Sequence, residues 1–130
     1  MGYKFGSKSL EKINHQLFSP ILRQLLTEAI KDSPIDFTVI ETVRTLEKQK
    51  EYIKKGTSKT LKSRHIPYCN KSGKCEAVDI APYPIDWSDT KRFDVLAEHI
   101  KKKAKEMGIN IQWGGDWKTL VDKPHFEIKR

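Results

Sequence analysis

Two histidines and two aspartates combine residue types that could bind a metal ion and transfer protons. His65 ends the phrase Ser-Arg-His, and Asp79 lies within the phrase Ala-Val-Asp-Ile. Further along the chain, Asp122 precedes His125 by three residues. Two imidazoles and one carboxylate can hold zinc tetrahedrally and leave the fourth position to water, whose proton a second carboxylate can accept. These four residues are therefore the candidate metal ligands and acid–base groups.

Each of these residues alone is weak evidence, because a single histidine is more often a satisfied surface or core residue. We assign that structural role to His15 and His99, the other two histidines of the chain. The four candidates differ from them in position. They lie at the edges of expected strands or next to expected turns, where a pocket would form.

Four helices and four strands are expected to position these groups. Apolar residues at helical spacing predict a first helix that carries Leu10, Ile13 and Leu17. Capping residues predict three more helices, which begin at Ser19-Pro20, Thr45 and Ser88 and end at Ser33, Gly56 and Gly108. Strands are predicted over residues 36–41, 77–81, 109–113 and 125–128, and the polar residues 57–74 are predicted to form a loop.

This order of elements predicts an α+β fold, in which helices pack against a small, mainly antiparallel sheet. The chain has 130 residues, which is the usual size of one domain, and we expect a single domain over residues 1–130. Apolar residues make up 37% of the chain and it has 12 aromatic residues (5 Phe, 4 Tyr and 3 Trp), so it is not disordered by composition.

The chain is basic, with 25 Lys and Arg against 17 Asp and Glu and a formal net charge of +8. Such a surface favours polyanions, among which nucleic acid, anionic lipid and an anionic cell wall remain open. No apolar stretch reaches the roughly 20 residues that cross a bilayer. The first residues also lack the apolar region of a secretory signal, so we expect synthesis in the cytoplasm and no export by that route.

The two cysteines, Cys69 and Cys75, leave three alternatives open. They could be free thiols in a reducing cytoplasm, or a disulfide that holds the loop after release into an oxidising space. They could also bind a second metal ion, although they lack the usual Cys-x-x-Cys spacing. Neither cysteine is expected to act as a catalytic nucleophile.

Several motifs in order resemble the D-alanyl-D-alanine carboxypeptidase superfamily of zinc peptidases. Ser-Arg-His at residues 63–65 and Ala-Val-Asp-Ile-Ala-Pro-Tyr at residues 77–83 resemble its Ser-x-His and Ala-x-Asp signature. Residues 36–45, which end in Val-Arg-Thr, resemble the strand that brings an arginine to the active site. Residues 113–117 and 122–127 resemble its C-terminal turn and last ligand motif. The superfamily includes vancomycin-resistance D,D-peptidases and phage L-alanyl-D-glutamate endopeptidases, and the chain is most similar to the latter.

The resemblance implies a hedgehog-like D,D-peptidase fold and a role for each matching residue. His65, Asp79 and His125 match the three ligands of one zinc ion, and Asp122 matches the general base. The same resemblance implies that Arg44 holds the carbonyl oxygen of the substrate.

Four further positions match the family around this set. Ser63 matches the serine of the signature, which fixes the ligand loop or contacts the substrate. Trp113, Asp116 and Trp117 match a turn that walls the cleft, and we expect them to be structural.

The chain departs from the family pattern at two points. His65 and Asp79 are 14 residues apart where the family has seven, so residues 66–76 contain an insertion that also carries both cysteines. The entropic cost of closing a loop grows only slowly with its length, so the insertion is compatible with a shared metal site. At position 122 the chain has Asp where many relatives have Glu.

The function implied by the resemblance is that of a phage endolysin, a zinc metallopeptidase that hydrolyses the L-Ala–D-Glu bond of bacterial peptidoglycan. We expect a monomer without a separate cell-wall-binding domain, not inserted in the membrane and not bound to nucleic acid. It would remain in the host cytoplasm until a holin-like pore gives it access to the periplasm and the cell wall, where it would contribute to lysis.

Three alternatives are kept beside this function. The first is a D-Ala–D-Ala carboxypeptidase or dipeptidase of the same fold, and the second is a nucleic-acid-binding module that uses the excess of lysine. The third is a zinc-binding homologue without catalysis, against which Asp122 and Arg44 argue, since a decayed site is free to lose both. The masses of muropeptide products would separate the first alternative from an endopeptidase.

Overall fold

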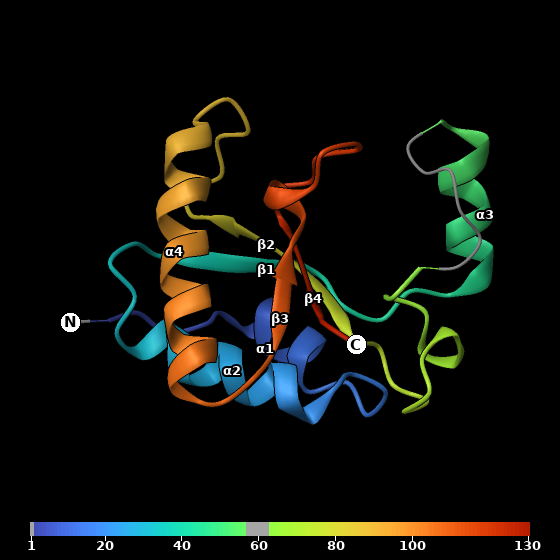
Figure 1. The fold of residues 1–130 in the computed structure, drawn as a ribbon, viewed down its shortest axis with the longest axis horizontal. Helices are drawn as coiled ribbons and strands as arrows, with labels where there is room; N and C mark the ends of the chain where they lie inside the picture. The colour runs from blue at the N-terminus through green and yellow to red at the C-terminus, as the bar shows by residue number, and fades with distance from the viewer. Residues whose placement is uncertain (1, 57–62) are drawn as a thin grey trace.

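The computed structural model describes residues 2–56 and 63–130, and these form an α+β fold built on one four-stranded sheet. The strands are β1 (Phe37–Glu41), β2 (Ala77–Pro82), β3 (Ile111–Trp113) and β4 (His125–Ile128). They lie in the order β1-β2-β4-β3, and each neighbouring pair is antiparallel. The predicted fold class and the antiparallel sheet are confirmed (Figure 1).

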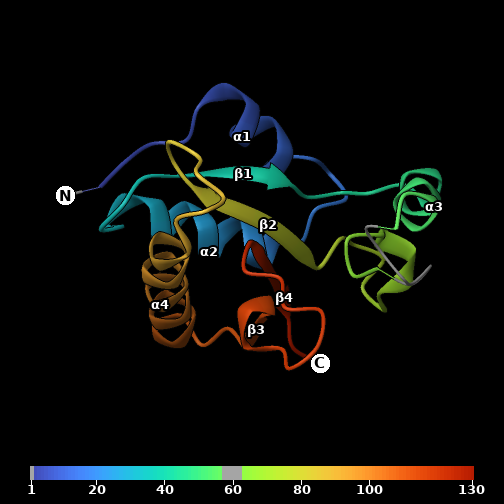
Figure 2. The same cartoon turned by 90° about the horizontal axis from the view of Figure 1, so that it is seen from above.

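Within the described ranges, four α-helices accompany the sheet. They are α1 (Ser7–Ile13), α2 (Pro20–Lys31), α3 (Leu46–Lys54) and α4 (Thr90–Glu106). Helix α2 packs against α4, and α1 contacts β1. Helix α3 lies at the opposite end of the molecule from α4 in both views (Figures 1 and 2). Two short 3₁₀ helices, η1 (Pro67–Cys69) and η2 (Gly114–Asp116), interrupt the loops.

Helix α2 shows how the local sequence produces the core. The side chain of Ser19 accepts a hydrogen bond from the Leu22 backbone N–H, and Pro20 occupies the first helical turn, where its missing N–H costs nothing. Five apolar residues of α2 then share one face and are buried: Leu22, Leu25, Leu26, Ala29 and Ile30. Burial of a leucine contributes about 1.5–3 kcal/mol, so this face anchors α2 in the hydrophobic core that it shares with α4.

Two helix boundaries differ from the sequence prediction. Ser88 was the expected cap of α4, but the capping residue is Asp89. Ser88 instead donates its hydroxyl to Asp86 Oδ1 at 2.6 Å, and the same oxygen accepts its backbone N–H, so a local turn keeps it out of the helix. The first helix ends at Ile13 and does not reach Leu17, because the backbone N–H of Leu17 bonds to His15 Nδ1.

The remaining boundaries agree with the sequence to within a few residues. Helix α3 follows its Thr45 cap, and α4 stops before Gly108, which has a φ of +71°. Gly108 therefore adopts the left-handed conformation that ends many helices. The predicted loop over residues 57–74 contains η1, and its residues 57–62 lie outside the described part of the chain.

Candidate metal centre

The register of β2 and β4 brings two of the candidate ligands together. Asp79 on β2 and His125 on β4 are directly paired across the two strands. Side chains at paired positions point to the same face of a sheet, and here His125 Nδ1 lies 3.1 Å from Asp79 Oδ1. Two residues 46 positions apart in the chain are therefore neighbours because of strand pairing alone.

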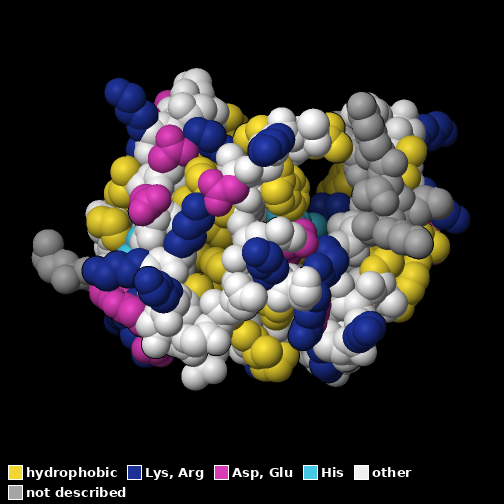
Figure 3. All heavy atoms as spheres, in the orientation of Figure 1, with side chains coloured by type: hydrophobic (Ala, Val, Ile, Leu, Met, Phe, Trp, Pro, Cys, Tyr) yellow, Lys and Arg dark blue, Asp and Glu magenta, His cyan; other side chains and the backbone are white. Residues whose placement is uncertain are grey.

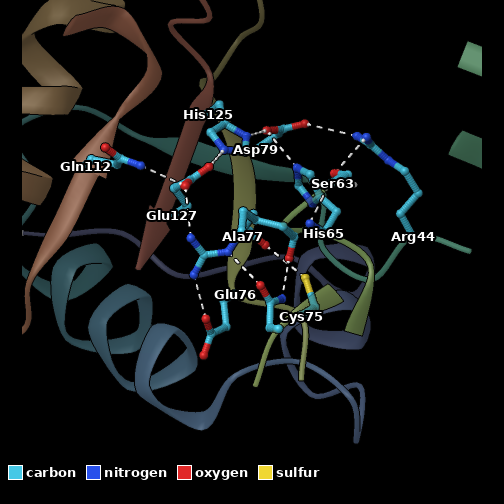
Figure 4. A network of polar contacts seen from close by, with 12 residues as sticks. Arg44, Ser63, His65, Cys75, Glu76, Ala77, Asp79, Gln112, His125 and Glu127 are labelled. Atoms are coloured by element: carbon cyan, nitrogen blue, oxygen red, sulfur yellow. Dashed lines mark hydrogen bonds and ion pairs between the residues drawn. The ribbon is translucent and has the colours of Figure 1, made fainter. Parts of the chain in front are cut away.

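His65 reaches the same carboxylate from outside the sheet. Its backbone carbonyl accepts a hydrogen bond from the Arg44 N–H, which attaches the segment after residue 62 to the end of β1. Its Nε2 lies 3.2 Å from Asp79 Oδ1, and its ring meets the His125 ring at a centroid distance of 5.2 Å. One ligand atom from each of His65, Asp79 and His125 lies within 4.8 Å of the others, so the three form a possible metal site (Figure 4).

In each imidazole, the ring nitrogen that faces away from Asp79, here called the outer nitrogen, contacts an oxygen that can only accept a hydrogen bond. His65 Nδ1 is 2.7 Å from the backbone oxygen of Thr42, and His125 Nε2 is 2.7 Å from Glu127 Oε1. Burial raises the pKa of Glu127, but hydrogen bonds from His125 and Gln112 lower it below its ordinary value, so Glu127 is ionised at neutral pH. Each outer nitrogen must therefore carry a proton.

This arrangement leaves three acceptors facing one another. In the neutral imidazoles, the lone pairs of His65 Nε2 and His125 Nδ1 both point at the Asp79 carboxylate. Such a contact is repulsive unless a second proton on one imidazole or a metal ion lies between the three atoms. The donor set and the fixed tautomers therefore fit a divalent metal ion.

The electrostatics of the centre also favour a positive charge. Burial raises the pKa of Asp79, but hydrogen bonds from His125 and His65 bring it well below its ordinary value. Burial lowers the pKa of His125, but Asp79 and Glu127 raise it to about 9. The two carboxylates stabilise either a proton or a metal ion at this point.

Asp122, the predicted general base, comes from the turn before β4. Its backbone N–H donates to the Gly114 backbone oxygen at 3.0 Å, and its own backbone oxygen accepts the His125 N–H at 3.1 Å. Burial raises the pKa of Asp122, and the nearby Asp79 carboxylate raises it further. Asp122 therefore lies within electrostatic range of the metal site, and its pKa is moved towards that of a general base.

Arg44 lies at the edge of the centre, where it is already held by several neighbours. Its Nη2 forms an ion pair with Glu41 and lies 4.0 Å from Asp79 Oδ2. Its Nη1 donates to Gln49 Oε1 at 2.7 Å and to Ser63 Oγ at 3.3 Å. Among the residues that the structure describes, its buried Nε has no hydrogen-bond partner.

Of the other predicted positions, Ser63 and Trp117 contact residues of the centre, whereas Trp113 and Asp116 have partners outside it. Ser63 Oγ accepts the His65 backbone N–H at 3.2 Å as well as the Arg44 contact, so it joins the ligand segment to the arginine. Trp117 stands with its ring 5.2 Å from that of His125. Trp113 is buried and donates its indole N–H to the Lys123 oxygen at 2.7 Å, while Asp116 is exposed and pairs with a lysine.

Glu127 is the residue of this centre that the sequence analysis left without a role. It follows His125 by two positions on β4, and residues two apart on a strand share one face, so the spacing could have identified it. Gln112 on the paired strand β3 donates to Glu127 Oε2 at 2.8 Å, and Arg64 donates to the same oxygen at 3.3 Å. Figure 4 shows the contacts of Glu127 with His125 and Gln112.

The inserted segment is a structured extension of this network. Asn70 donates to the backbone oxygens of Arg64 and Lys74 at 2.9 and 2.8 Å, which closes the loop on itself. The Glu76 N–H bonds to the Arg64 oxygen at 3.0 Å, so the chain returns to the metal centre despite the extra residues. The 14-residue separation of His65 and Asp79 therefore does not prevent their convergence.

Both cysteines are free thiols in the structure, as the first of the three alternatives has them, and a disulfide formed in an oxidising space stays a prediction. Cys75 is buried, and its Sγ lies 3.1 Å from the Thr42 oxygen, which also accepts His65 Nδ1. Neither cysteine belongs to the metal group found among the described residues. His15 and His99 are structural, since His15 accepts the Leu17 N–H and His99 Nε2 donates to the Ala29 oxygen at 2.8 Å.

Comparison with known proteins identifies the family of the chain. A family model described as phage L-alanyl-D-glutamate peptidase matches residues 1–130. The L-alanyl-D-glutamate peptidase of Escherichia phage T5 is 35% identical over 136 aligned residues, which cover 100% of this chain and 92% of that protein. The enzyme of the same name from Listeria phage A118 is 32% identical over 94 residues, which cover 72% of this chain and 31% of the relative.

A solved structure supports the same assignment. The Serratia marcescens L-Ala D-Glu endopeptidase ChiX superposes with a TM-score of 0.81 at 32% identity, and the match covers 97% of this chain and 90% of that one. The shared fold therefore extends over the sheet, the helices and the loops that carry the candidate centre. The chain belongs to the phage L-alanyl-D-glutamate peptidase family.

Proposed function

We propose that the chain is a zinc-dependent endolysin that hydrolyses the L-Ala–D-Glu bond in the stem peptides of bacterial peptidoglycan. The observation that supports this most strongly is the convergence of His65, Asp79 and His125 within 4.8 Å, with their outer nitrogens held in the tautomers that a metal ion requires. Zinc is the metal that best suits two imidazoles and one carboxylate. When bound, it lowers the pKa of a water molecule to about 7 and so supplies a nucleophile at neutral pH.

In this proposal, Asp122 acts first as the general base and then as the general acid. Its carboxylate accepts a proton from the attacking water and later transfers it to the amine that leaves from D-Glu. Burial and the Asp79 carboxylate both raise the pKa of Asp122, which makes it a stronger base than an exposed aspartate. The peptide bond between the carbonyl carbon and the amide nitrogen breaks as this proton is delivered.

Arg44 is proposed to stabilise the negative charge that forms on the carbonyl oxygen. Its guanidinium is fixed by Glu41, Gln49 and Ser63, so the charge does not have to be oriented during the reaction. A positioned donor of this type contributes about 3–4 kcal/mol to transition-state stabilisation in other hydrolases. The role of Ser63 is then to hold both Arg44 and the His65 segment, and direct contact with the substrate stays a prediction.

The proposal includes the route by which the protein meets its substrate. We propose that it is a monomer that remains in the host cytoplasm until a membrane pore opens and that it then acts on the cell wall. No helix within the described residues is long and apolar enough to cross a membrane. The net charge of +8 favours encounter with an anionic envelope, an effect that salt weakens.

Product masses from digested peptidoglycan test the assigned bond. The zinc-loaded protein is expected to release stem peptides that begin with D-Glu and to leave L-Ala on the muramic acid, whereas Asp122→Asn is expected to release nothing while keeping its metal. Loss of terminal D-Ala alone would contradict this assignment and favour a D-Ala–D-Ala carboxypeptidase. Equal rates for the parent and Asp122→Asn would show that Asp122 is not the base.

A further inference from the structure

A concave site lies beside the metal centre. A cavity of about 500 Å³ is formed by the C-terminal half of α4, the strand β3 and the 3₁₀ helix η2. Trp117 lines this cavity, and its ring is also 5.2 Å from that of His125, so the cavity and the metal centre share a wall. Gln112 is a second link, because it lines the cavity and donates to Glu127, which holds His125.

The cavity is basic and partly aromatic. Its lining includes Lys101, Lys105 and Lys129, and Asp116 is its one acidic residue. Lys101 is neutralised by Asp116 at 2.7 Å and lies 4.9 Å from the centre of the Trp113 ring. Figure 3 shows lysine and arginine side chains next to hydrophobic ones on this face.

Two of these lysines have no ion-pair partner among the described residues. Within residues 2–56 and 63–130, neither Lys105 nor Lys129 forms an ion pair, and both side chains are exposed. They therefore give the cavity a net positive charge beside the apolar faces of Trp113 and Trp117. This combination suits a ligand that carries carboxylates on a short aliphatic framework.

We propose that this cavity binds the carboxylates of the stem peptide on the D-Glu side of the cleaved bond. The inference rests on the proposed function and deepens it by naming the part of the substrate that is recognised. On the L-Ala side, the substrate continues into an amide-linked sugar without a free carboxylate. On the other side, D-Glu is linked through its side chain and keeps its α-carboxylate, and the next residue, when it is diaminopimelate, brings another.

The dimensions agree with this assignment. An extended peptide advances about 3.3–3.6 Å per residue, and the link through the D-Glu side chain is longer, so the next residue lies about 7 Å or more from the cleaved bond. The ring of Trp117, which lines the cavity, lies 5.2 Å from that of His125, so the cavity begins within such a step of the metal centre. The lysines would then select substrates with free carboxylates and hold the scissile amide near Asp122.

Binding of the dipeptide γ-D-glutamyl-diaminopimelate to the zinc-loaded protein tests the proposal independently of hydrolysis. Titration followed by NMR is expected to shift the indole N–H signals of Trp113 and Trp117. The double variant Lys105→Gln/Lys129→Gln is expected to bind the dipeptide about tenfold or more weakly. The matched control is Lys8→Gln/Lys71→Gln, which removes the same charge from exposed positions outside the cavity and is expected to bind like the parent.

A second ligand separates specific recognition from general attraction. The same dipeptide with its carboxylates amidated is expected to bind the parent weakly and to be unaffected by either double variant. Equal losses in the cavity variant and the control would overturn the proposal, since the lysines would then act only through net charge. A glycerol phosphate oligomer that gives the same shifts as strongly as the dipeptide would also overturn it, in favour of an anionic wall polymer.

The outcome for the cavity can be read apart from that for the proposed function. If the dipeptide binds at Trp113 and Trp117 while the parent leaves peptidoglycan uncleaved, the proposed function fails and the cavity assignment stands. If the parent cleaves the L-Ala–D-Glu bond but the cavity variant binds and cleaves like the parent, the cavity assignment fails and the function stands.

Discussion

Thr42 connects the candidate metal centre to the buried thiol of Cys75. The backbone oxygen of Thr42 accepts a hydrogen bond from His65 Nδ1 at 2.7 Å and lies 3.1 Å from Cys75 Sγ. Burial raises the pKa of Cys75 to about 12, so this thiol stays protonated and can donate its S–H to this oxygen or to the Ala77 oxygen, which is also 3.1 Å away. Cys75 is thus a structural part of the centre and is protected from oxidation by the core around it.

Alkylation of the native protein is therefore expected to modify one cysteine only. Cys69 is partly exposed, whereas Cys75 is fully buried and held as a thiol. Treatment with iodoacetamide at pH 7.5, followed by mass spectrometry of peptides, is expected to label Cys69 and to reach Cys75 only after unfolding. Comparable labelling of both cysteines in the native state, or a mass two daltons below that of the reduced chain, would contradict the free-thiol arrangement.

Replacement of Gly114 by alanine is expected to displace the catalytic carboxylate. A Cβ at position 114 would lie 2.2 Å from the Asp122 backbone oxygen and 3.1 Å from its Cβ, so the Asp122 turn must move. A shift of about 1 Å in a catalytic group can reduce the rate by about 100-fold. Gly114→Ala is expected to lose activity to this extent while it binds zinc with the parental stoichiometry.

The matched control for this change is Gly6→Ala. An added Cβ at Gly6 meets no atom within 4 Å, and its φ of −73° suits any residue. This variant is expected to retain parental activity. A fully active Gly114→Ala protein would mean that the position of Asp122 is less critical than the geometry implies.

Glu127→Gln is expected to weaken metal binding without removing a ligand. The substitution replaces the acceptor that holds His125 Nε2 at 2.7 Å by an amide that can present its N–H₂ group instead. Loss of such an outer partner typically reduces metal affinity by about 10–100-fold. Competition with a chromogenic chelator measures this change directly and does not depend on activity.

Glu76→Gln is the matched control for Glu127→Gln. Glu76 pairs with the same Arg64 at 2.6 Å, but among the described contacts it does not touch His125. The control is expected to lose stability and to keep parental zinc affinity. Equal affinities for both variants would show that Glu127 does not tune the metal ligand.

Glu76 is also expected to produce an acid-dependent loss of stability. Burial raises its pKa, but ion pairs with Arg130 and Arg64 bring it below the ordinary value of 4.5. A lowered pKa in the folded state means that the unfolded chain binds the proton more readily, so folding is favoured above pH 4.5 and this contribution is lost as the pH falls through the folded-state pKa. Denaturant titrations of the metal-free protein between pH 6 and pH 3 should therefore show a steeper decline in the parent than in Glu76→Gln. Parallel curves would rule out this contribution.

The sequence predicted the parts of the centre that depend on strands and local motifs. Asp79 and His125 lie in segments with clear strand patterns, and their pairing follows once the two strands are antiparallel neighbours. The turn Gly114–Asp116 lies where the Trp-Gly-Gly-Asp-Trp motif was noted. These features arise from residues close in sequence and could be inferred without coordinates.

Contacts between distant segments could not be inferred in the same way. The partners of Arg44 depend on how α3 and the segment after residue 62 pack against β1, which no local pattern reveals. The tautomers of His65 and His125 follow from Thr42 and Glu127, and only the spacing of Glu127 leaves a trace in the sequence. The Ser88 boundary was missed because a side-chain turn with Asp86 competed with capping.

The most direct measurement is the anomalous diffraction of zinc in crystals of the loaded protein, recorded on both sides of the zinc absorption edge. We predict one strong peak about 2.0–2.2 Å from His65 Nε2, His125 Nδ1 and an Asp79 carboxylate oxygen. A peak bound by other side chains, or full zinc occupancy in a His125→Ala crystal at the same position, would contradict the proposed ligand set.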